Sequence, residues 1–161
     1  MEVNLFGSML IAHRVLLYLR STRGSLILMY SVSAFYGPPE YASYGASKAC
    51  VLTFAQALRI ELAATGIHIG VVSPHSVDTP MLDERNRRSP FVQRFGTPHT
   101  AEEVAEAILR GVECRQFMIW PGRQPRLIFW LSHFLNPPLS HQVILRLWQW
   151  AGSRSSRRNQ A

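Results

Sequence analysis

Tyr44 and Lys48 are the two residues whose types and spacing point most directly to chemistry. They stand four positions apart in the run Tyr44-Gly-Ala-Ser-Lys48. On a helix this spacing places both side chains on one face. An ammonium group beside a phenol stabilises the phenolate and lowers the phenol's pKa from its ordinary value of about 10, so that the phenol can act as a general acid for a carbonyl oxygen or, as phenolate, as a base for an alcohol. By itself the spacing is more typical of a Tyr–Lys pair on the protein surface. The surrounding sequence is needed to distinguish such a pair from a catalytic one.

The surrounding sequence predicts alternating helices and strands that would hold this pair at the end of a parallel sheet. Apolar residues at helical spacing predict helices, and short apolar runs predict buried strands. A capping box at Thr100 predicts the start of the third helix, and Gly66 is expected to stop the second. The predicted elements are a helix over 3–19, a strand over 25–30, a turn-rich loop over 31–39, a helix over 41–64, a strand over 67–72, a polar lid over 85–99, a helix from the capping box to 110 and a strand over 117–120.

The run from Gly24 to Lys48 resembles the active-site strand, loop and helix of the short-chain dehydrogenase/reductase family. In that family a serine hydrogen-bonds the substrate oxygen, a tyrosine transfers the proton, and a lysine tunes the tyrosine and holds the nicotinamide ribose. The resemblance assigns these catalytic roles to Ser31, Tyr44 and Lys48, with Tyr44 and Lys48 also contacting the cofactor. Ser33 is a second hydroxyl nearby, but its spacing to the tyrosine is two residues short of the family's.

Two further segments extend the resemblance. Val3-Asn-Leu-Phe-Gly7 is similar to the helix that carries the family's fourth catalytic residue, an asparagine in a proton relay, which here is Asn4; an asparagine near a helix start is also a common cap. The segment Val72–Pro80 resembles the family's Pro-Gly-x-x-x-Thr motif and implies cofactor contacts at Pro74, Val77 and Thr79. His75 replaces the usual glycine, which leaves the local backbone conformation open; it is expected to be a tolerated loop residue rather than a group that faces the substrate.

The resemblance implies the C-terminal half of a Rossmann-type, doubly wound α/β fold over residues 1–122, followed by a helical extension over 123–161. It implies a reversible NAD(P)-dependent interconversion of a carbonyl and a secondary alcohol, with NADP or NAD as cofactor and NADPH slightly favoured. The sequence contains no Thr-Gly-x-x-x-Gly-x-Gly turn of the kind that cradles a pyrophosphate. We therefore expect that the first nucleotide-binding βαβ unit is missing and that the chain is truncated, which leaves the activity of the isolated chain open.

The extension is basic and rich in tryptophan. From Arg123 onward it holds six arginines and no acidic residue, within a chain of formal net charge +7. Its apolar runs, 127–135 and 143–150, are too short to span a bilayer. They suit helices at a membrane interface, a cover over the substrate pocket, or a dimer contact. Beyond Glu102 the sequence looks like family members that reduce long-chain 3-keto lipids, the 3-ketodihydrosphingosine reductase-like proteins being the nearest in pattern.

These features limit the partners and the compartment. We expect a small-molecule substrate, lipid-like in its chemistry, a homo-oligomer formed through the helix with Tyr44 and the helix before it, and peripheral membrane contact through 123–150. The two cysteines, Cys50 and Cys114, indicate neither a disulfide framework nor a metal site, and a cytoplasmic location fits best. No nucleic-acid-reading module is recognisable. The alternative function is a non-catalytic fragment that acts through its tail as a membrane- or protein-interaction module.

Overall fold

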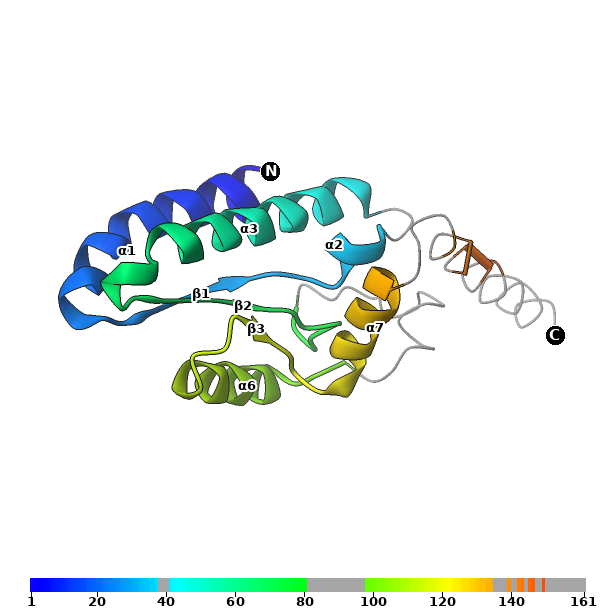
Figure 1. Ribbon diagram of the computed structural model, residues 1–161. Coiled ribbons are helices and arrows are strands. Elements are labelled where there is room, and N and C mark those ends of the chain that lie inside the picture. Colours follow the sequence, from blue (N-terminus) through cyan, green and yellow to red (C-terminus); the bar gives the residue numbers. More distant parts are fainter. Residues whose placement is uncertain are drawn as a thin grey trace.

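The computed structural model describes residues 1–37, 41–80 and 98–134, together with the single positions 139, 142, 143, 145, 146 and 149. Three strands and the helices between them follow one another along the chain (Figure 1). In chain order the elements are the π-helix η1 (Glu2–Gly7), α1 (Ser8–Thr22), β1 (Ser25–Met29), α2 (Ser33–Tyr36), α3 (Ala42–Glu61), the 3₁₀ turn η2 (Ala63–Thr65), β2 (His68–Val72), α6 (Ala101–Glu113), β3 (Met118–Ile119) and α7 (Arg123–Phe134).

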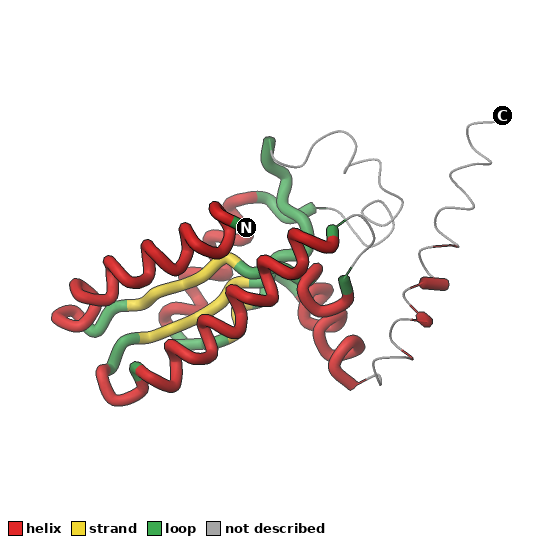
Figure 2. The backbone as a smooth tube through the Cα atoms, turned by 90° about the horizontal axis from the view of Figure 1, so that it is seen from above, coloured by secondary structure: helices red, strands yellow, loops and turns green. Residues whose placement is uncertain are grey.

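The sheet is parallel and has the order β1-β2-β3. Ser25 pairs with His68 and Met29 with Val72, so β1 and β2 are in register along their whole length. Parallel neighbours need a crossover connection, and α3 and α6 supply it. α1 and α3 lie over one face of the sheet and α6 lies under the other (Figures 1 and 2). The predicted three-stranded parallel α/β sheet is confirmed.

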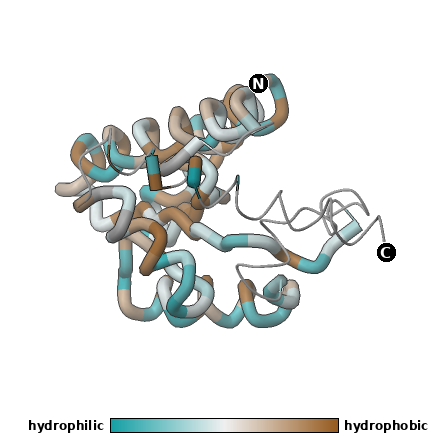
Figure 3. The backbone as a smooth tube through the Cα atoms, turned by 90° about the vertical axis from the view of Figure 1, so that its right-hand side faces the viewer, coloured by the Kyte–Doolittle hydropathy of each residue, from teal (hydrophilic) through white to brown (hydrophobic). Residues whose placement is uncertain are grey.

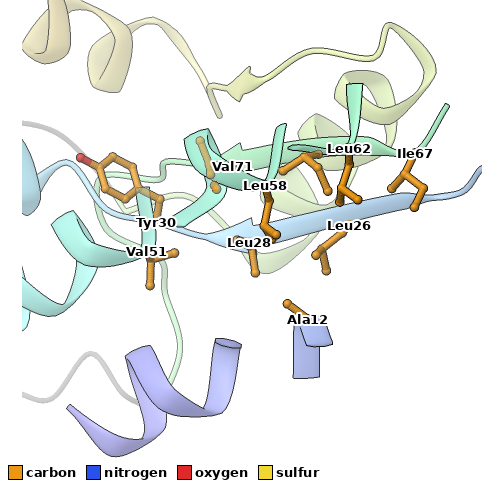
Figure 4. Close-up of a cluster of buried hydrophobic side chains, with 11 residues drawn as sticks. Ala12, Leu26, Leu28, Tyr30, Val51, Leu58, Leu62, Ile67 and Val71 are labelled. Atoms are coloured by element: carbon orange, nitrogen blue, oxygen red, sulfur yellow. The ribbon is translucent and has the colours of Figure 1, made fainter. Parts of the chain in front are cut away.

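The main core lies between the sheet and the helices α1 and α3. Figure 4 shows side chains of β1, β2 and α3 meeting there, with Ala12 of α1 closing the cluster from below. Ala12, Val51, Ala55 and Val71 are fully buried. The small Ala12 and Ala55 side chains let the helices approach the strands closely, and the branched residues of the strands fill the remaining space.

On the opposite face, α6 packs Val104 and Ala107 against Val72 and Ile119. The helix begins with the predicted capping box: the Thr100 hydroxyl accepts from the Glu103 N–H at 3.2 Å, and the Glu103 carboxylate accepts from the Thr100 N–H at 3.0 Å. Two otherwise unpaired N–H groups at the helix start are satisfied in this way.

Three local features differ from the sequence expectations. The predicted loop after β1 contains the short helix α2, because the Ala34 and Phe35 N–H groups bond back to the carbonyls of Ser31 and Val32. The first helix opens with six π-helical residues instead of α-helical ones. The second predicted helix ends at Glu61, three residues early, and passes through a 3₁₀ turn to Gly66 with φ +79°, the left-handed conformation that glycine tolerates.

Two predicted regions are described only in part: of the lid, only 98 and 99 are described, and of the apolar run 143–150, only positions 143, 145, 146 and 149. Within the part of the chain that the structure describes, the search for a helix long and apolar enough to cross a membrane finds none.

Gly111 is a position where the packing of α6 admits no side chain. A Cβ atom built there would lie 2.5 Å from both Cγ1 and Cδ1 of Ile119, which is itself fully buried. We predict that Gly111→Ala lowers the free energy of unfolding by about 1–3 kcal/mol, the usual cost of overpacking, although alanine is the better helix former. Urea denaturation followed by circular dichroism measures the change. The loss should shrink in an Ile119→Ala background; equal losses in both backgrounds would contradict this account of the contact.

Candidate active site

The predicted site residues gather where β1 and β2 end and where α3 begins. In a parallel sheet with crossover helices, the carboxyl ends of all strands and the amino ends of the following helices meet at one edge. Ser31 follows β1, the segment 74–79 follows β2, and Tyr44 and Lys48 lie in the first two turns of α3. Asn4 reaches the same edge from η1, which contacts α3.

Lys48 is the most constrained of these residues. Its side chain is 8% exposed, and its Nζ donates a hydrogen bond to the main-chain carbonyl of Met29, the last residue of β1, at 3.0 Å. Burial lowers the pKa of the ammonium, because the charged form loses hydration. The same Nζ lies 5.7 Å from the centre of the Tyr44 ring. Lys48 thus joins the strand end to the helix and places a cation beside the tyrosine.

Tyr44 is 36% exposed, so part of its side chain reaches solvent, and the Lys48 Nζ lies over its ring. The ring of Tyr41, one turn earlier, meets it edge-on with 6.2 Å between the ring centres. The next residue, Gly45, is buried, and a Cβ atom there would lie 3.0 Å from the Ser33 carbonyl oxygen. A glycine after the tyrosine therefore allows α3 to approach the loop that carries the serines.

Ser31 and Ser33 form a buried pair of hydroxyls at the end of β1. The Ser31 Oγ accepts two hydrogen bonds, from the Ser33 hydroxyl at 2.9 Å and from the Ser33 N–H at 3.3 Å. Neither bond uses the proton of Ser31, which can still be donated to an oxygen in the site. Ser33, which the sequence spacing set aside as a catalytic candidate, orients Ser31.

A hydrogen-bond chain connects Asn4 to the helix that carries Tyr44. The Asn4 amide donates to the Ser47 hydroxyl at 3.3 Å, and that hydroxyl donates to the Tyr44 carbonyl at 2.7 Å. Ser47 is almost fully buried. The sequence interpretation passed over Ser47, although a serine three residues after the tyrosine lies on the same side of the helix and could have been noticed. Asn4 lies within the π-helix η1, and π-helical turns are frequent at functional sites.

The segment 74–79, which follows β2, is held by hydrogen bonds to His99. The His99 N–H bonds to the Ser76 carbonyl at 2.9 Å and the His99 carbonyl accepts from the Asp78 N–H at 2.8 Å, in a parallel bridge between Val77 and His99. Pro74 is buried, and Val77 and Thr79 are half-buried. Pro74, Val77 and Thr79 lie at the same edge of the sheet as the other candidates. The two hydrogen bonds with His99, however, attach their segment to the start of α6 and not to Tyr44 or Lys48.

The structure answers the question of the backbone at His75. Among the described non-glycine residues, positive φ angles occur at Arg23 and Arg115, so His75 does not need the conformational freedom of glycine. The residue is half-buried, with Nδ1 3.3 Å from the Ser76 hydroxyl. Burial lowers the pKa of His75, and the neighbouring His99 lowers it further. In the part of the chain described, no cluster of three or more His, Cys, Asp or Glu side chains could hold a metal ion.

His75 should make the fold sensitive to acid. Its pKa in the folded state lies below the ordinary value of 6.5, so the unfolded state binds the proton more readily. The stability that the neutral ring contributes is complete above pH 6.5 and is lost as the pH falls through the folded-state pKa. We predict that His75→Gln loses less unfolding free energy than the parent between pH 7.5 and 5, by up to about 1.4 kcal/mol per pH unit. Urea titrations across this range test it; parallel pH profiles for the two proteins would refute it.

Comparison with known proteins identifies the family to which this chain belongs. Residues 1–90 match the family model described as short chain dehydrogenase. An 11-beta-hydroxysteroid dehydrogenase-like protein, 4A, of Arabidopsis thaliana is 31% identical over 137 residues, covering 81% of this chain and 44% of the relative. A 3-oxoacyl-(acyl-carrier-protein) reductase of Thermotoga maritima is 36% identical over 116 residues, covering 67% of this chain and 46% of the relative.

The solved structures agree in fold. A short chain dehydrogenase from Burkholderia cenocepacia in complex with NADP superposes with a TM-score of 0.73 at 26% identity, covering 91% of this chain and 58% of that one. The chain spans about half the length of the curated relatives it matches. The match over 1–90 includes Asn4, Ser31, Tyr44 and Lys48 together with the segment after β2, and on it the chain belongs to the short-chain dehydrogenase family.

Proposed function

We propose that this chain carries the catalytic residues of an NAD(P)-dependent oxidoreductase that interconverts a carbonyl and a secondary alcohol. The observation that carries the proposal is the buried Lys48 ammonium, bonded to the Met29 carbonyl and lying 5.7 Å from the ring centre of Tyr44. A surface Tyr–Lys pair would have no reason to bury its cation, because desolvation of an ammonium is costly. Burial of the Lys48 ammonium is explained if its positive charge stabilises the phenolate form of Tyr44.

Each candidate residue then has one task in proton transfer. In the direction of reduction, the Tyr44 hydroxyl gives its proton to the carbonyl oxygen, and the Lys48 ammonium stabilises the phenolate that remains. Ser31 donates a hydrogen bond to the same substrate oxygen, in the orientation set by Ser33. Asn4, held by Ser47, belongs to the relay that returns a proton to Tyr44. In the direction of oxidation the same groups work in reverse.

The residues also suit the nicotinamide half of the cofactor, which when bound supplies or accepts the hydride. The bond to Met29 uses one of the three N–H donors of Lys48, and the others can serve ribose hydroxyls. The segment after β2 offers backbone groups at Val77 and Thr79, with Pro74 at its start, for the carboxamide. NADP or NAD fits this role; the bound NADP of the Burkholderia relative supports the choice of NADP.

We further propose a hydrophobic, lipid-like substrate. An open pocket of about 290 Å³ lies between β3 and α7, with mostly apolar walls formed by Gln116, Met118, Trp120, Arg126, Phe129 and Trp130. Phe129 also meets Phe35 of α2, so the pocket adjoins the helix that follows Ser31.

The expected self-association through α1 and α3 has support in exposed apolar side chains of α1 such as Leu10 and Leu17.

Cofactor binding separates the role of Lys48 from that of Tyr44. If the 161-residue chain binds NADPH without a pyrophosphate-cradling turn, we predict that Lys48→Met weakens the binding at least about tenfold through loss of a charged hydrogen bond, and that Tyr44→Phe changes it less than about threefold. A titration of nicotinamide fluorescence measures all three affinities, with NADH in a parallel series. Absence of saturable binding would show that these residues do not hold the cofactor in this chain.

Turnover tests the proton donor. With NADPH and a panel of long-chain keto compounds, we predict that Tyr44→Phe lowers the rate of NADPH oxidation by about a hundredfold or more, the usual contribution of a general acid. Ser43→Ala, a neighbouring exposed hydroxyl in the same helical turn, serves as the matched control and should retain the parent rate. Parent-like turnover in Tyr44→Phe would remove Tyr44 from the mechanism.

A further inference from the structure

Helix α7 presents two faces of different character. On the inner face Pro125 is fully buried, and the Phe129 ring packs edge-on against Phe35 with 4.8 Å between ring centres. Phe129 also lies 5.2 Å from the ring of Trp120. These aromatic contacts attach α7 to α2 and to the end of β3, and they determine which side of the helix faces water.

The outer face carries an apolar ridge. Leu127, Trp130 and Phe134 are 59%, 44% and 78% exposed, and their spacing of three and four residues puts them on one side of the helix. The rings of Trp130 and Phe134 stack with 5.1 Å between their centres. Figure 3 looks onto the end of the molecule where α7 lies. Large apolar side chains left in water side by side mark a contact surface, because covering them is favourable.

The charged side chains of α7 itself have one sign. Arg123 and Arg126 are exposed in the first turn of α7, so they border the ridge at its N-terminal end. No aspartate or glutamate follows Glu113 anywhere in the sequence. A second copy of this chain has no acidic residue on α7, or in the sequence after it, to pair with these arginines, which argues against a dimer contact through this face. A surface that offers anionic groups above an apolar layer complements both features.

We propose that the outer face of α7 docks onto an anionic lipid surface. Trp130, Leu127 and Phe134 would enter the boundary between headgroups and acyl chains, where tryptophan is favoured. Arg123 and Arg126 would pair with lipid phosphates. The helix has 12 residues and a length of about 18 Å, so it lies along the interface instead of crossing it. The proposal does not depend on the oxidoreductase activity, although α7 packs against the helix that follows Ser31. Arg126 and Trp130 also line the pocket between β3 and α7.

Co-sedimentation of the 161-residue chain with vesicles tests the proposal. We expect binding to phosphatidylcholine vesicles that contain 30% phosphatidylserine, in low salt, and at least about tenfold weaker binding to pure phosphatidylcholine. Arg123→Glu/Arg126→Glu should reduce the affinity for anionic vesicles about tenfold or more. The matched control is Arg14→Glu/Arg20→Glu on α1, which changes the net charge equally at exposed positions of another helix and should bind nearly as the parent does.

A second pair of variants tests the contribution of the apolar ridge to vesicle binding. Trp130→Ser/Phe134→Ser should lose at least about tenfold in vesicle affinity, whereas Ile60→Ser, at a 78% exposed position on α3, should not. Unchanged binding in both α7 variants, or equal loss in the α1 control, would overturn the assignment of the surface to α7. Self-association of the parent that Trp130→Ser/Phe134→Ser abolishes, measured by sedimentation velocity without lipid, would identify a second copy as the occupant and also overturn it.

Discussion

The hydrogen bond from the Lys48 ammonium to the Met29 carbonyl is the interaction on which the candidate site depends. It links the last residue of β1 to the second turn of α3 and holds a buried cation beside Tyr44. A desolvated ammonium needs such a partner, and the bond leaves further donors for a ligand. Ser31, Ser33 and Gly45 lie around the same junction, so a change in the packing of α3 against β1 would displace all of them together.

The parallel sheet provides the frame for this junction. Because each strand returns through a crossover helix, the chain comes back to the same edge after every unit. Residues as distant in sequence as Asn4 and Ser47 are brought into contact in this way. The small side chains of Ala12 and Ala55, and the absence of any side chain at Gly45 and Gly111, allow the helices to lie close enough for these contacts to form.

The C-terminal helix shows how one element can serve two environments. Phe129 is held among the rings of Phe35 and Trp120, while Trp130, the next residue, is 44% exposed and also lines the pocket beside β3. The apolar run at 127–135 therefore belongs in part to the body of the protein and in part to its surface. The choice between a membrane interface, a cover over the substrate pocket and a dimer contact for this run remains a matter for the experiments proposed above.

The sequence by itself determined the order of the main helices and strands and the capping box at Thr100, because helical periodicity and capping motifs are local properties. It also identified Tyr44, Lys48, Ser31 and Asn4 as candidates. Only the tertiary structure decided that Ser47 joins Asn4 to α3, that Ser33 orients Ser31, and that segment 74–79 is held by His99. These contacts join residues that local patterns cannot relate, or depend on a turn such as α2 whose geometry is set by what packs around it.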